Sequence, residues 1–209
     1  MPPYNRTHTL KIAIDSILEQ TYPNIEIIIC DDSTDDGVQE MVEHYLHSYS
    51  QIKYHKNEKN LFLKNWHKGY NLASGEYINY LMDDDMFHKD KISKMIRFFN
   101  EFENITLVTS YRQTINESGE FLSPIGATVR LYEEIRIMDG KVLENTVLTR
   151  CLNVIEEPTT VLLSFLSNIE VIYSFMYGNI GKMSTRKKIK HKIIKRVRRR
   201  LNYVTQCFS

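Results

Sequence analysis

The sequence has few cysteines, no long apolar run and, near its end, no acidic residues. Its three cysteines among 209 residues are Cys30, Cys151 and Cys207, and they form neither a CxxC pair nor a Cys/His ligand spacing. This argues against a disulfide framework and a structural zinc site, and it favours reduced thiols in a cytoplasmic protein. The most apolar stretch, VLLSFLSNIEVIYSFMYGNIG, contains Glu170 and several Asn and Ser residues, so it is a poor membrane span.

Positive and negative charges are divided unequally along the chain. Residues 182–209 hold 11 of the 27 basic residues and none of the 26 acidic ones. Apolar residues recur at helical spacing among these cations, which predicts a helical tail that contacts an anionic membrane surface through residues 182–200, at the inner face of the membrane. A solvated run of charge is the alternative. Aromatic residues do not alternate with the cations, so we expect no nucleic-acid partner.

Helical patterns and short apolar runs alternate through the first half of the chain. The segments are, in order, 10–18 (helix), 25–30 (strand), 38–46 (helix), 52–55 (strand), 60–73 (helix), 77–81 (strand), 89–103 (helix) and 105–110 (strand). This order predicts an α/β fold, with a mostly parallel sheet flanked by helices. No strand precedes the first helix, although the first strand of such a sheet is normally central.

Two acidic clusters follow predicted strands. CDDSTDDG starts at Cys30, and MDDD ends at Asp85. Ligands of open α/β sheets bind outside the carboxyl ends of the strands, so both clusters are expected near one crevice. Asp83 and Asp85 alternate along the chain and would face one ion on an extended segment, and carboxylates suit Mg²⁺ or Mn²⁺. Solvated turns are the alternative for both clusters.

The stretch PYNRTHTLKIAIDSILEQTYPNIEIIICDDSTDD, followed by NWHKGYNLASGEYINYLMDDD, resembles the family 2 glycosyltransferases. These are inverting nucleotide-sugar enzymes of the GT-A fold. The resemblance is dense from Pro2 to Phe87 and continues weakly to Thr160, through NVIEEPTTVLL. It implies a GT-A domain over residues 1–163, followed by a divergent apolar segment over 164–181 and the basic tail over 182–209.

The resemblance also implies roles for individual residues. It implies a catalytic base near the acceptor, for which Glu157 is the candidate, and a divalent cation, Mn²⁺ or Mg²⁺, bound by Asp83 and Asp85. The nucleotide-sugar contacts that it implies are at Pro3, Tyr4, Arg6, Asp31, Asp32, Asp83 and Asp84. The implied reaction moves a sugar from a nucleotide-diphosphate-sugar to the hydroxyl of a glycan or lipid-linked acceptor with inversion, in bacterial surface polysaccharide synthesis.

Three departures from the family pattern suggest alternatives. The opening strand is absent, and Met1 aligns just before the family's proline, so we expect the protein to begin upstream. The family's Glu-Asp pair has no counterpart after Leu163, and Glu156 replaces a glycine. A degenerate nucleotide-sugar-binding protein without turnover is therefore the second hypothesis. A phosphoacceptor receiver domain, suggested by the acidic strand ends, is the third, although no strand-end lysine that such domains need is identifiable.

Overall fold

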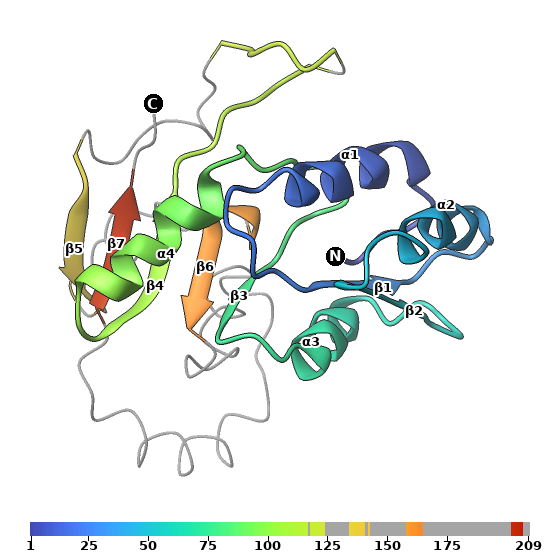
Figure 1. Cartoon of the computed structure of the whole chain (residues 1–209), viewed down its shortest axis with the longest axis horizontal. Coiled ribbons are helices and arrows are strands. Elements are labelled where there is room, and N and C mark those ends of the chain that lie inside the picture. The colour runs from blue at the N-terminus through green and yellow to red at the C-terminus, as the bar shows by residue number, and fades with distance from the viewer. Residues whose placement is uncertain (117, 124–133, 141, 143–157, 165–201, 207–209) are drawn as a thin grey trace, which may run out of the picture. The chain divides into compact units, whose positions relative to one another are not determined.

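The computed structural model describes residues 1–116, 118–123, 134–140, 142, 158–164 and 202–206 (Figure 1). The chain divides into two compact units, Met1–Ile96 and Arg97–Ser209. The domain predicted over 1–163 therefore includes all of the first unit and part of the second. The residues that the sequence singles out for ligand binding all belong to the first unit.

The first unit alternates helices with strands, as the apolar pattern predicts. Its elements are α1 (Thr7–Leu18), β1 (Ile27–Asp31), α2 (Gly37–Leu46), β2 (Ile52–Lys56), α3 (Leu63–Leu72) and β3 (Tyr77–Asn79), and α4 (Lys91–Glu101) begins at its end. Figure 1 shows α1 and α2 on one side of β1 and β2, with α3 on the other. The predicted α/β fold is confirmed.

Burial on both faces explains why β1 is apolar on nearly every residue. β1 and β2 pair in parallel, with Ile27 opposite Ile52 and Asp31 opposite Lys56. α3 packs on β1 and α2 packs on β2, so β1 has little contact with water. Each apolar side chain buried in this way stabilises the fold by about 1.5–3 kcal/mol.

The first residues of the chain lie extended along the other edge of β1. The α-amino group of Met1 donates a hydrogen bond to the Ile28 carbonyl at 2.8 Å. The backbone N–H of Cys30 donates to the Met1 carbonyl at 2.9 Å, and that of Asp32 donates to the Pro3 carbonyl at 3.1 Å. This pairing brings the residues after Pro3 beside the end of β1, where the first acidic cluster begins.

The C-terminal end of α1 fixes the segment that follows the second acidic cluster. The backbone N–H of Phe87 donates to the Ser16 hydroxyl at 3.0 Å, and that of Ile92 donates to Gln20 Oε1 at 3.1 Å. Gln20 Nε2 also donates to the His88 carbonyl at 2.9 Å. Ser16 in α1 and Gln20 just after it thus satisfy backbone groups that would otherwise lack partners, and they help to fix the segment that follows the cluster.

The second unit contains a mixed sheet in the order β6, β4, β7, β5. The strands are β4 (Ile105–Ser110), β5 (Arg136–Asp139), β6 (Val161–Ser164) and β7 (Asn202–Gln206), and a 3₁₀ turn (Pro158–Thr160) precedes β6. β4 pairs antiparallel with β6 and parallel with β7, and β7 pairs antiparallel with β5.

Strand β7 corrects one prediction. Residues 202–206 belong to the segment predicted to be a helical tail, but they form a strand between β4 and β5. Pairing with two neighbouring strands is a tertiary interaction that the periodicity of a single segment does not reveal. Residues 182–201, for which the helix was mainly predicted, lie outside the described residues. Among the described helices, none is both long and apolar enough to span a membrane.

Candidate nucleotide-sugar site

Two consecutive aspartates at the end of β1 have different environments. Asp31 is fully buried. Its Oδ1 accepts a hydrogen bond from the Ser33 backbone N–H at 2.7 Å, and its Oδ2 accepts one from the Tyr54 hydroxyl at 2.6 Å. Burial, together with the bond to Asp31, raises the pKa of Tyr54 and keeps the phenol protonated as a donor. Both oxygens of Asp31 are used within the chain, so this residue supports the turn.

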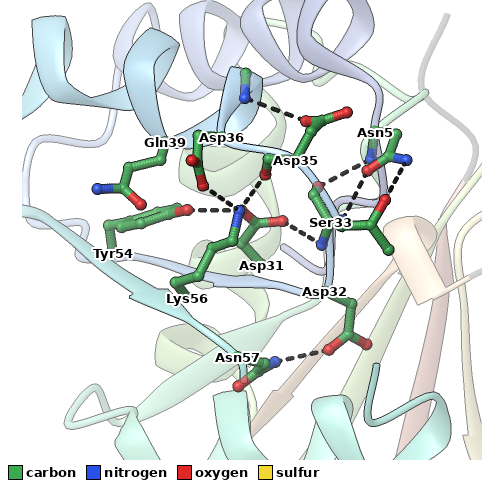
Figure 2. Close-up of polar contacts among 12 residues, drawn as sticks. Asn5, Asp31, Asp32, Ser33, Asp35, Asp36, Gln39, Tyr54, Lys56 and Asn57 are labelled. Atoms are coloured by element: carbon green, nitrogen blue, oxygen red, sulfur yellow. Dashed lines mark hydrogen bonds and ion pairs between the residues drawn. The ribbon is translucent and has the colours of Figure 1, made fainter. Parts of the chain in front are cut away.

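Lys56, opposite Asp31 on β2, supplies the counter-charge of the first acidic cluster. Its Nζ lies 3.6 Å from Asp31 Oδ2 and 3.4 Å from Asp36 Oδ1, and it also donates to the backbone carbonyl of Asp35 (Figure 2). A buried carboxylate is tolerated only when it is paired and hydrogen-bonded, and Asp31 meets both conditions. This part of the cluster needs no external cation.

Asp32 lies on the opposite side of the chain from Asp31 (Figure 2). Its Oδ1 accepts hydrogen bonds from Asn57 Nδ2 at 2.8 Å and from the backbone N–H of Leu61 at 3.1 Å. Among the described residues, none donates a hydrogen bond to its Oδ2. The side chain is nearly buried, with 8% of the residue exposed. One oxygen of a positioned carboxylate is thus left to accept a hydrogen bond from a ligand.

A side-chain network that the sequence reasoning missed holds Asp32 in place. Lys68 Nζ donates to Asn57 Oδ1 at 2.5 Å, and Asn57 Nδ2 donates to Asn65 Oδ1 at 2.9 Å as well as to Asp32. Asn65 Nδ2 in turn donates to the carbonyl of Cys30 on β1 at 2.7 Å. The available signal was the motif NWHK at residues 65–68, which the resemblance covers but which was not interpreted as polar.

The segment Pro3–Arg6, which bends at Tyr4 and Asn5, connects the two acidic clusters. The Asp32 backbone N–H donates to the Pro3 carbonyl at 3.1 Å. One residue further on, the backbone N–H of Tyr4 donates a hydrogen bond to the carboxylate of Asp83. The prediction that both clusters lie near one place is therefore supported within the first unit, because both contact adjacent residues of this segment.

Arg6 faces the second acidic cluster. Its guanidinium lies 2.8 Å from Asp84 Oδ2 and 3.7 Å from Asp83 Oδ1. Asp83 is only 5% exposed. Burial, with the neighbouring charge of Asp84, raises the pKa of Asp83, and the opposing effects of Arg6 and of the bond from Tyr4 are too small to reverse it. Asp83 is therefore a buried carboxylate whose charge the protein does not fully compensate.

Asp85 completes the second cluster. Burial lowers the pKa of Lys91 to about 7, and the negative charge of Asp85 opposes this shift. No group of three or more His, Cys, Asp or Glu side chains in the described part of the chain is arranged to hold a metal ion. Magnesium commonly takes only one or two carboxylates together with ligand phosphates. The ion site predicted at Asp83 and Asp85 therefore stays a prediction.

The remaining predicted residues cannot be placed against this site. Glu156 and Glu157 lie outside the described residues, as do residues 165–201 with most of the basic tail. The base and the membrane contact predicted for them stay predictions. Of the nine residues singled out from the sequence, the structure brings six together at the segment Pro3–Arg6: Pro3, Tyr4, Arg6, Asp32, Asp83 and Asp84. Asp31 is fully buried at the end of β1.

The first unit is a wound α/β domain in which the acidic turns after two strands both contact the segment Pro3–Arg6. The sequence profile of Glycosyl transferase family 2 matches residues 1–155, and the chain belongs to this family. The hypothesis of a phosphoacceptor receiver domain is therefore wrong.

Curated relatives are similar over the same region. A Rickettsia felis protein described as an uncharacterized glycosyltransferase is 38% identical over 132 residues, which cover 60% of this chain and 20% of that protein. WfgD of Escherichia coli, named as a UDP-Glc:alpha-D-GlcNAc-diphosphoundecaprenol beta-1,3-glucosyltransferase, is 33% identical over 135 residues, covering 59% of this chain and 49% of WfgD. The chain thus spans half or less of the length of these relatives.

Solved structures confirm the fold. Residues 1–349 of Staphylococcus aureus TarS, in complex with UDP-GlcNAc, superpose with a TM-score of 0.63 at 17% identity, covering all of this chain and 57% of that one. A longer TarS structure gives a TM-score of 0.60 at 19% identity, over 78% of this chain and 27% of TarS. The predicted GT-A fold is confirmed by this likeness.

Proposed function

We propose that this chain binds a nucleotide-diphosphate-sugar and transfers the sugar to an acceptor hydroxyl with inversion at the sugar carbon. One observation carries the proposal: Asp32, whose Oδ2 is open, and Asp83, a carboxylate that is only 5% exposed, both contact the segment Pro3–Arg6. A hydrogen-bond acceptor beside a site that requires positive charge suits a ligand with an N–H or O–H edge at one end and a cation-bound diphosphate at the other.

The nucleoside end of the donor would bind at the end of β1. Asp32 Oδ2 would accept a hydrogen bond from the base or the ribose, while Asn57 and Leu61 hold the other oxygen in place. Tyr4 is 46% exposed and would contact the nucleoside beside Asp32. Asp31 would act indirectly, because its oxygens already accept bonds from Ser33 and Tyr54.

The diphosphate end would bind at the second acidic cluster. Asp83 and Asp85 would hold Mn²⁺ or Mg²⁺, which stabilises the negative charge of a departing diphosphate. Asp84 faces the guanidinium of Arg6 at 2.8 Å, so it would keep this cation at the edge of the site. When the donor binds, the guanidinium of Arg6 would give up part of its contact with Asp84 and donate a hydrogen bond to an oxygen of the diphosphate.

The transfer itself needs one more group. The bond between the sugar carbon and the diphosphate oxygen breaks as the acceptor oxygen forms its bond from the opposite face. The acceptor proton passes to a carboxylate base, and Glu157 is the candidate on the resemblance. WfgD is named for a lipid-linked acceptor, which supports a glycan or diphospholipid acceptor here and a role in bacterial polysaccharide synthesis. The basic residues 182–200 would bring the chain to such a membrane.

Donor titrations test this proposal. The full chain is titrated with UDP-glucose, UDP-GlcNAc and GDP-mannose, with and without Mn²⁺, by calorimetry. We expect one donor to bind. Mn²⁺ should increase the affinity for that donor by about 10-fold or more, because the diphosphate of the donor would be a ligand of the ion. Asp85→Asn should abolish the Mn²⁺-dependent gain, whereas Asp90→Asn, a matched change on the same segment, should leave it within about 2-fold.

Two results would contradict the proposal: no binding of any donor, or the same Mn²⁺-dependent gain in Asp85→Asn as in the unchanged chain. Release of nucleoside diphosphate in the presence of an acceptor separates a transferase from the second hypothesis. A protein that binds donor tightly yet releases no diphosphate with lipid-linked or glycan acceptors would be the binding protein without turnover.

A further inference from the structure

We propose that Phe62 stacks on the base of the bound nucleotide and helps to determine which donor the site accepts. This inference rests on the proposed function and adds a residue to it. Phe62 precedes helix α3 and is 75% exposed, the largest exposed fraction among the large apolar side chains described. Exposure of a single apolar side chain is common and proves little by itself.

The backbone of Phe62 is the unusual feature. Its φ is 49° and its ψ is −129°, a combination that glycine adopts readily and that a side chain with a Cβ adopts only with strain. The other described non-glycine residues with positive φ are Asn5 and Asn104, and asparagine tolerates such angles. Phe62 is therefore the described residue where a bulky side chain occupies a glycine-like conformation.

This conformation is held by specific hydrogen bonds. The backbone N–H of Phe62 donates to Asn60 Oδ1 at 2.8 Å, and its carbonyl accepts a bond from the Asn65 N–H at 3.0 Å. The strain has no compensation in buried area, because most of the ring is in water. Strained residues that persist without such compensation point to function, here a ligand that contacts the ring.

The position of Phe62 identifies that ligand. The preceding residue, Leu61, donates its backbone N–H to Asp32 Oδ1 at 3.1 Å. Pro3, whose carbonyl accepts the Asp32 backbone N–H at 3.1 Å, is followed by Tyr4. Phe62 and Tyr4 are thus each one residue away from a group bonded to Asp32, and both are exposed.

A flat base has the chemistry that this arrangement favours. It presents an N–H edge to the open oxygen of Asp32 and aromatic faces to Tyr4 and Phe62. Stacking between a base and an aromatic side chain contributes enough affinity for its loss to weaken binding by about 10-fold. Phosphate and sugar groups lack such a face, so the contribution of Phe62 should be confined to the base.

Three variants test the proposal in the full chain with Mn²⁺. Phe62→Gly removes the ring and suits the backbone angles, so it should melt no lower than the unchanged protein. Its affinity for whichever of UDP and GDP binds the unchanged protein more tightly should fall by about 10-fold. Its affinity for inorganic pyrophosphate should stay within about 2-fold of that of the unchanged protein. Phe62→Trp should retain affinity, and its indole fluorescence should be quenched by that nucleotide but not by pyrophosphate. Leu63→Ala, the neighbouring exposed residue, should change neither affinity.

The outcomes separate this inference from the proposed function. If the unchanged protein binds UDP or GDP and Phe62→Gly binds it equally well, the stacking role is wrong and the proposed function stands. Equal weakening towards nucleotide and pyrophosphate would also overturn the stacking role, because the variant would then have disturbed the whole site. If the unchanged protein binds neither nucleotide, both proposals fail.

Discussion

The two acidic clusters of the first unit have similar sequences and different physical roles. In the cluster at the end of β1, Asp31 is fully buried, is paired with Lys56 and accepts a hydrogen bond from the Tyr54 hydroxyl. In the cluster that ends at Asp85, Asp83 faces the guanidinium of Arg6 at 3.7 Å, and the side chain of Arg6 is 54% exposed. The same residue type thus supports a turn in one place and leaves unbalanced charge in the other.

The difference follows from what each turn packs against. The first turn ends a strand whose parallel neighbour places Lys56 opposite Asp31, so the counter-charge is part of the sheet. The second turn contacts the segment Pro3–Arg6, which offers a backbone N–H and one half-exposed guanidinium. A carboxylate that is buried without a full counter-charge costs stability, and such sites are commonly kept for function.

Replacing Asp31, the aspartate that supports the first turn, should have the largest effect on stability. Asp31→Ala leaves Lys56 without its buried partner and removes the acceptor of Tyr54 and Ser33, so we expect the free energy of unfolding to fall by about 3–5 kcal/mol. Urea denaturation measures this loss. Asp36→Ala, whose side chain is 78% exposed, is the matched control and should change stability by about 0.5 kcal/mol or less. A loss below about 1 kcal/mol for Asp31→Ala would show that the cluster is not structural.

Replacing Glu26, which precedes β1, should have an intermediate effect on stability. Partial burial alone would raise its pKa, but hydrogen bonds from Lys53 and Ser74 outweigh burial and lower the pKa to about 2. Because the folded pKa lies below the unfolded value, the stabilisation is present above about pH 4.5 and is lost as the pH falls towards 2. Glu26→Gln should therefore cost about 1–2 kcal/mol at pH 7, allowing for the partial exposure of the carboxylate to water, and about half of that at pH 3.

Thermal melts of both proteins at pH 7 and pH 3 test this expectation. The difference in melting temperature between Glu26→Gln and the unchanged chain should shrink at the lower pH. If the difference in melting temperature is the same at both pH values, the charge of Glu26 contributes nothing to stability and only the shape of its side chain matters.

Asp83→Asn should have the smallest effect on stability and the opposite sign. Burial raises the pKa of Asp83, so its ionised form is disfavoured by the fold, and stability is lost as the pH rises through the folded pKa. Removing the charge should stabilise the protein at pH 7 by up to about 1 kcal/mol, and the gain should fade below about pH 4. The same variant should bind donor more weakly in Mn²⁺. Destabilisation at pH 7 would mean that Asp83 is a second supporting aspartate.

The sequence predicts the framework of this site well and its fine roles poorly. The apolar run at 25–30 and the two acidic clusters were visible because burial and strand ends have simple patterns. The distinction between Asp31 and Asp32 was not visible, since it depends on Tyr54, Lys56 and Asn57, which reach the turn only through the pairing of β1 with β2.

Two other features were beyond local patterns for related reasons. The conformation of Phe62 is set by the side chain of Asn60 and by the start of α3, and nothing in the residue type predicts a positive φ. Strand β7 lies in a segment whose spacing favours a helix, and its strand state depends on β4 and β5. In each case the deciding contact comes from outside the segment.

The short segment Pro3–Arg6 has a consequence for the order of binding events. It is bonded to Asp32 through Pro3, to Asp83 through Tyr4 and to Asp84 through Arg6. A ligand group that shifts this segment at one end changes the geometry of the contacts at its other end, within a segment of only four residues. Under the proposed function, binding of the nucleoside and binding of the ion are therefore coupled, and each changes the affinity for the other by the same factor.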